Sequence, residues 1–167
     1  MVSRRLVLTV IAAGAFGAAP AAPAVASDAT LKREIRSNLV KNRPVLTSFQ
    51  EAVDGFVEAD AAKRRTAAAR LENATDRLRP RISSYKRGVA RNSTSSRNGA
   101  IAKRTLLSGL REFDTGLREY KRAADKVRAG ASKSSVLPSL RRADRRFLLA
   151  AKREEAAITR LNIERPD

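Results

Sequence analysis

The sequence predicts an all-α protein, an antiparallel up-down helical bundle of three long helical runs and a short N-terminal helix, preceded by a cleaved signal peptide. Three observations predict this class. Apolar residues recur in steps of three and four along most of the chain, which is the spacing of one helix face. Residues 27–167 contain 21 alanines, and alanine has the highest helix propensity, whereas strand-forming aromatic residues are few. Stretches rich in turn-forming residues separate the periodic segments.

The first 26 residues are typical of an export signal. Arg4 and Arg5 form a positive start, an apolar stretch follows over 6–19, and small residues at 24–26 precede Ser27. A membrane anchor is disfavoured because the apolar stretch is shorter than the roughly 20 residues that a span needs, and prolines at 20 and 23 interrupt its extension. We therefore expect a signal peptide at 1–26, one domain at 27–167, and a secreted or extracytoplasmic protein of the cell envelope.

The export route stays open between two alternatives. The segment 3–8, Ser-Arg-Arg-Leu-Val-Leu, resembles a twin-arginine export motif, although Val7 stands where that motif usually has phenylalanine. An ordinary export signal that happens to contain two arginines is the alternative.

Prolines and periodicity divide the first half of the mature chain. A short helix is expected from Ser27 or Asp28 to about Pro44, with the apolar spacing of Leu31, Ile35 and Leu39. The second helical run is expected to start at Pro44, because proline fits the first turn of a helix. Pro80 should break or bend this run, because proline lacks a donor and crowds the preceding turn.

The second half carries the clearest pattern. A helix is expected over about 100–129, with a seam of seven apolar positions that alternate steps of four and three, and a last helix near Pro138 has a similar seam. Gly109 and Gly116 are expected to permit close approach of a neighbouring helix. The segments 92–99 and 130–135 are expected to be turns, and short connections place successive helices antiparallel. The seam positions are Leu106, Leu110, Phe113, Leu117, Tyr120, Ala124 and Val127, then Val136, Leu140, Ala143, Phe147, Ala150, Ala157 and Leu161.

Composition excludes most catalytic and metal chemistry. The 167 residues include no cysteine and no histidine, so disulfides, thiolate or imidazole metal sites and nucleophile-histidine pairs are ruled out. Glu51, Asp54 and Glu58 share one helix face and could hold a hard cation, but a solvated stripe that pairs with arginines is the favoured interpretation. We therefore expect no enzyme activity, no cofactor and no metal.

Charge is the strongest functional signal. The chain carries 35 Lys and Arg against 17 Asp and Glu, and its formal net charge is +18. Ten basic residues and no acidic residue lie between Arg77 and Arg111, on both sides of the turn at 92–99. Folding back at this turn should gather them at one end of the bundle, where the amides before a helix N-terminus also favour an anion. The predicted anion-binding residues are Arg77, Arg79, Arg81, Lys86, Arg87, Arg91, Ser95, Ser96, Arg97, Lys103, Arg104 and Arg111.

These features predict an exported, cofactor-free protein that binds an anionic, phosphate-rich polymer of the envelope or the extracellular space through this basic tip. Arginine outnumbers lysine 24 to 9 in residues 27–167, and its planar fork suits phosphate. Sequence-specific nucleic-acid binding is not expected, because zinc ligands and an aromatic stacking platform are missing. The alternative is a secreted interaction or scaffold module that binds an acidic protein or itself; neither interpretation fixes the oligomeric state.

Overall fold

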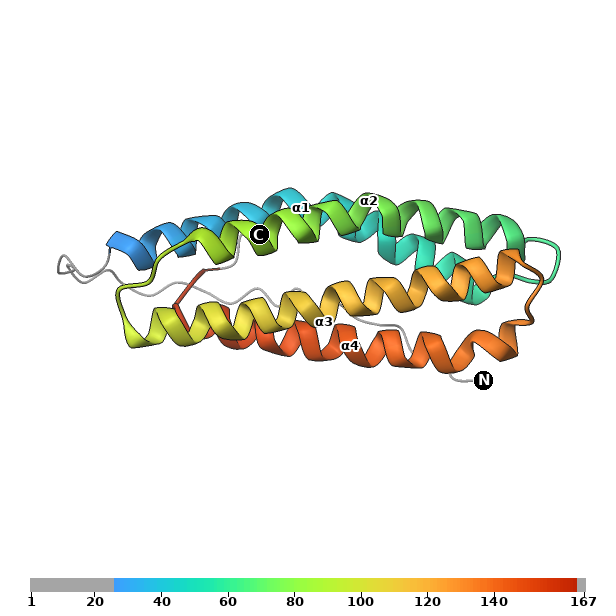
Figure 1. Ribbon diagram of the computed structural model, residues 1–167. Helices are drawn as coiled ribbons and strands as arrows, with labels where there is room; N and C mark the ends of the chain where they lie inside the picture. The colour runs from blue at the N-terminus through green and yellow to red at the C-terminus, as the bar shows by residue number, and fades with distance from the viewer. Residues whose placement is uncertain (1–25, 165–167) are drawn as a thin grey trace.

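The computed structural model describes residues 26–164, and within this range it contains four α-helices and no strand. They are α1 (Ala26–Glu58), α2 (Arg64–Arg91), α3 (Arg97–Arg128) and α4 (Lys133–Arg160). All four lie along a common long axis, with the connections at its two ends (Figure 1). The all-helical bundle is therefore confirmed. The predicted signal peptide, apart from Ala26, lies outside the described residues.

Consecutive helices pack against each other. Hydrogen bonds connect late residues of one helix of the α3–α4 pair with earlier residues of the other. The Tyr120 hydroxyl of α3 donates to Asp144 of α4, and Arg160 of α4 donates to the Asn98 side chain of α3. In the same way, Lys121 and Lys103 of α3 contact Asp76 and Ala90 of α2. These contacts place late residues of α2 beside early residues of α3, and late residues of α3 beside early residues of α4.

Gly109 and Gly116 of α3 lie where α4 approaches closely. A Cβ added at Gly109 would stand 3.1 Å from the Ala150 carbonyl oxygen, and one at Gly116 would stand 3.3 Å from the Phe147 ring. The expectation that these glycines permit close helix approach is confirmed. Larger residues at these positions would force α3 and α4 apart.

One apolar core runs through the bundle. Leu106, Leu117 and Tyr120 of α3 are almost fully buried, as the seam predicts, and Phe113 and Phe147 are partly buried against the core. Their rings join a cluster with the ring of Phe49 from α1; the Phe113 and Phe147 centroids lie 4.6 Å apart. Aromatic packing therefore connects α1 with α3 and α4.

Several predicted helix boundaries are wrong. There is no short N-terminal helix, because α1 is 33 residues long and continues through Pro44. At Pro80, which was expected to break or bend its helix, the break does not occur, because α2 continues through it. The last helix, α4, begins at Lys133, inside the predicted turn at 130–135 and ahead of Pro138. The chain instead breaks at 59–63, a segment without proline or glycine that was expected to be helical. The bundle therefore has four long helices.

Solvent exposure explains why the prolines are tolerated. Pro44, Pro80 and Pro138 are all exposed, so water can bind the backbone carbonyl that each proline leaves without a donor. Buried neighbours hold the helix on both sides, such as Leu78 and Ile82 around Pro80. Core packing thus offsets the local cost of the missing hydrogen bond.

The break between α1 and α2 has a different cause. No large apolar residue lies between Val57 and Leu71, so a helix through this segment would have nothing to bury. The Lys63 amide donates to the Asp60 side chain at 2.9 Å, which supports the turn before α2. Within residues 26–164, no helix has both the length and the hydropathy that crossing a bilayer requires.

Candidate anion-binding site

Two arms of the chain carry the predicted basic residues: 77–91 of α2 and 97–111 of α3. The Lys103 ammonium donates to the carbonyls of Ala90 at 2.8 Å and Asn92 at 2.5 Å, so it joins the two arms beside their connection. At the other limit of the arms, Arg79 lies 3.4 Å from Asp114. These contacts place both arms side by side over the same half of the bundle, which we call the basic end.

Most of these cations are available to a ligand. Arg79 and Lys103 are used in the contacts above. The remaining eight are exposed, and none of them makes an ion pair with any residue in the described part of the chain. They are Arg77, Arg81, Lys86, Arg87, Arg91, Arg97, Arg104 and Arg111.

The amide cradle at the start of α3 is already filled. The Asp28 carboxylate, at the start of α1, accepts a hydrogen bond from the Ser95 amide at 3.1 Å and another from the Ser96 hydroxyl. Ser96 itself caps α3, because its hydroxyl oxygen accepts from the Gly99 amide at 2.8 Å. The Ser95 amide and the Ser96 hydroxyl, which were predicted to contact an external anion, therefore hold an anion of the protein itself.

The N-terminal half of α1 adds positive charge that the sequence interpretation did not assign to this end. Gly88 of α2 lies against Glu34 of α1 so closely that a Cβ at Gly88 would overlap the Glu34 carboxylate. Because Asp28 and Glu34 both contact the basic end, Lys32, Arg33 and Arg36 lie on the same half. Charge counts alone could not reveal this, since they do not say which helix ends lie together.

Carboxylates in the middle and in the C-terminal half of α3 neutralise arginines of α4. Glu112 contacts Arg146 at 2.6 Å and Arg153 at 3.0 Å. The hydrogen bond from Arg146 is the main reason that the pKa of Glu112 lies below its ordinary value, and Arg153 adds to the shift. Glu119 similarly contacts Arg142 at 3.5 Å. The arginine cluster at 141–146 is therefore partly neutralised, unlike the basic end.

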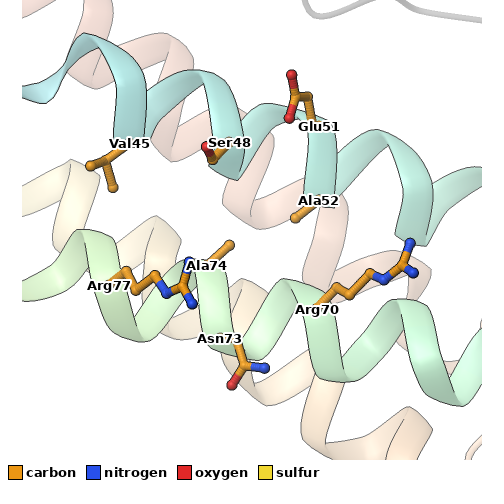
Figure 2. Close-up of a pocket in the computed structure, with 8 residues that line it drawn as sticks. All are labelled: Val45, Ser48, Glu51, Ala52, Arg70, Asn73, Ala74 and Arg77. Carbon is orange, nitrogen blue, oxygen red and sulfur yellow. The ribbon is translucent and has the colours of Figure 1, made fainter.

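A shallow groove of about 370 Å³ lies between α1 and α2 and reaches the basic end at Arg77 (Figure 2). Ala52 and Ala74 face each other across it, and their small side chains leave it hollow. In this view, the guanidinium of Arg70 extends to the α1 side, whereas Glu51 points away from α2. The groove thus has an apolar centre and is lined by two arginines, Arg70 and Arg77.

The predicted acidic face of α1 does not form a metal centre. Glu51, Asp54 and Glu58 are exposed, and the Gln50 amide donates to Asp54 at 2.9 Å. No group of three candidate ligands that could hold a metal ion occurs within residues 26–164. The favoured interpretation paired these carboxylates with arginines of a neighbouring helix, but no such ion pair involves them in the described structure.

No protein family model, curated protein or solved structure matches this chain. The arrangement of its own residues therefore carries the functional argument.

Proposed function

We propose that the protein is exported, is released by cleavage of a signal peptide at 1–26, and binds an anionic, phosphate-rich polymer of the envelope or extracellular space without a cofactor. In this proposal residues 27–167 form one antiparallel up-down bundle, and the basic end is the binding surface. Eight exposed cations without an ion pair in the described structure are the single observation that carries the proposal.

The mechanism is electrostatic. A linear polyanion carries condensed counterions, and basic side chains that approach its charged groups release them, which makes binding favourable and dependent on salt. Arginine forks also form charge-assisted hydrogen bonds with phosphate oxygens. Because Asp28 fills the cradle at the start of α3, the contacts come from side chains rather than from backbone amides.

A salt series with inorganic polyphosphate tests the proposal. For four phosphate contacts, we expect the affinity to fall about 50-fold between about 50 and 200 mM salt, from the slope measured for single-stranded polyanions. Reversal of Arg87, Arg91, Arg97 and Arg104 to glutamate should remove most of the binding. The matched control reverses the same number of exposed cations at the opposite end, Arg65, Lys126, Arg141 and Arg145. Salt-independent affinity, or equal losses in both variants, would contradict the proposal.

The second candidate is an interaction module that uses the outer face of α4. Leu148 and Leu149 are 55% and 37% exposed, which is unusual for large apolar side chains on an otherwise charged helix. Gly109 and Gly116 cannot serve this purpose, because α4 covers them. Analytical ultracentrifugation of the L148S/L149S variant distinguishes this candidate: loss of a stoichiometric complex or of self-association supports it, and an unchanged monomer excludes self-association through this face.

A further inference from the structure

The groove between α1 and α2 points to a more specific ligand than a generic polyanion. We propose that it holds one repeat of a polyol phosphate chain, with a phosphate on each of Arg70 and Arg77 and the hydroxyl-bearing linker between them. The proposal rests on the proposed function, because Arg77 belongs to both the groove and the basic end.

The spacing of the two arginines suits two successive charged groups of a slender chain. Arg70 and Arg77 are two helical turns apart on α2, which corresponds to about 10 Å along the helix axis. Both are exposed, and neither makes an ion pair with a residue in 26–164. Their guanidinium groups are therefore free to contact phosphate oxygens bidentately.

The rest of the lining selects for hydroxyl groups. Ser48 and Asn73 line the groove on opposite sides, and Glu51 lines its α1 side. All three are exposed; Figure 2 shows the Asn73 amide directed away from α1, so Asn73 can exchange hydrogen bonds with a polyol at the rim of the groove, and Ser48 can do so from the α1 side. The Glu51 side chain points away from α2, so its carboxylate borders the rim of the groove, where it is unfavourable for a bare phosphate chain but can accept hydrogen bonds from the hydroxyls of a polyol linker.

The shape of the groove disfavours a nucleic acid. Its centre is made of Ala52, Ala74 and Val45, and no aromatic residue lines it. Single-stranded nucleic acids gain much of their affinity from bases that stack on aromatic rings. A chain without bulky substituents fits the alanine floor better.

Two soluble probes of equal charge separate polyol recognition from charge alone: a glycerol phosphate oligomer and inorganic polyphosphate, measured by calorimetry on the purified full chain. We expect the glycerol phosphate oligomer to bind more tightly. The R70S/R77S variant should lose about tenfold in affinity for it, the effect of two exposed charge contacts. The matched control K126S/R141S, with the same loss of net charge, should change this affinity less than twofold.

A charge-neutral variant tests the hydroxyl contacts. S48A/N73A should weaken binding of the glycerol phosphate oligomer about fivefold, the effect of one net hydrogen bond, and leave polyphosphate binding unchanged. Equal affinity of the wild-type protein for both probes, or equal losses in R70S/R77S and its control, would overturn the groove assignment. If neither probe binds in a salt-dependent way, the proposed function itself fails, so the two failures are distinguishable.

Vesicles identify the source of the polyol phosphate. Binding to phosphatidylglycerol vesicles but not to phosphatidylserine vesicles, with loss in R70S/R77S, would assign the glycerol phosphate of a lipid headgroup. Binding of the soluble oligomer alone would assign a free polymer. Binding to both vesicle types that R70S/R77S leaves unchanged would show that lipid charge, and not the groove, determines adsorption.

Discussion

Removal of the Asp28 carboxylate should destabilise the whole bundle, because this side chain joins the start of α1 to the start of α3. Asp28 is 8% exposed and accepts hydrogen bonds from the Ser95 amide and the Ser96 hydroxyl. It also lies at the positive end of the α3 dipole. We expect Asp28→Ala to lower the free energy of unfolding by about 2–3 kcal/mol, from two hydrogen bonds to a charged acceptor and a favourable dipole contact.

Thermal unfolding followed by far-ultraviolet circular dichroism measures this effect. A loss of 2–3 kcal/mol corresponds to a decrease in Tm of about 6–12 °C for a domain of this size. Glu155→Ala is the control, because Glu155 is exposed and makes no ion pair or hydrogen bond among those found in the described structure. Its Tm should change by less than about 2 °C, as expected for a surface substitution.

Added sulfate provides a second measurement. In Asp28→Ala the Ser95 amide and the Ser96 hydroxyl lose their anion, so sulfate should bind at the start of α3 and raise the Tm more in this variant than in the wild-type protein. A variant that unfolds at the wild-type Tm and gains nothing from sulfate would refute the role assigned to Asp28.

Two further predictions concern glycine and tyrosine. Gly55→Ala should raise the free energy of unfolding by about 1 kcal/mol, because α1 gains helix propensity and nothing lies within 4 Å of the new Cβ. Gly109→Ala should lower the free energy of unfolding, because its Cβ forces α4 away. Equal Tm increases in both variants would contradict this packing. Burial is the main cause that raises the pKa of both tyrosines in the chain, Tyr85 and Tyr120, with Glu154 and Asp144 as the respective next causes. Because unfolded tyrosine titrates near pH 10, the folded state retains more protons above that pH and its stability should decrease as pH rises further. Tyrosinate absorbance should therefore appear together with unfolding; ionisation of either tyrosine near pH 10 in the folded protein would contradict this expectation.

Periodicity predicted the parts of the fold in which every local signal agrees. The seams of α3 and α4 were identified from the sequence because apolar residues keep helical spacing over the whole length of each helix, and burial follows that spacing directly. The glycines at 109 and 116 were interpreted correctly for the same reason, because they lie beside a continuous seam. The run of cations from Arg77 to Arg111 was equally visible, since it depends only on residue type.

The boundaries in the first half could not be derived in this way. Whether Pro44 or Pro80 ends a helix depends on whether its side of the helix faces water, and that depends on the other helices. The alanine-rich segment 59–63 has helical propensity but nothing to bury, so the chain turns there and α2 packs back on α1. The absence of large apolar residues between Val57 and Leu71 indicates this break, but the alanine-rich composition of the segment favours a continuous helix.

By itself, the sequence determined that the chain forms helices, which faces of α3 and α4 are buried, and where positive charge is concentrated, because these properties follow from neighbouring residues along one helix. Only the tertiary structure decided that Asp28 binds the Ser95 amide and the Ser96 hydroxyl before α3, that α1 adds cations to the basic end, and that Arg70 and Arg77 border one groove with Ser48. The physical reason is distance along the chain. Asp28 and Ser95 are 67 residues apart, and no local propensity or spacing specifies which of many carboxylates will bind a given amide and hydroxyl.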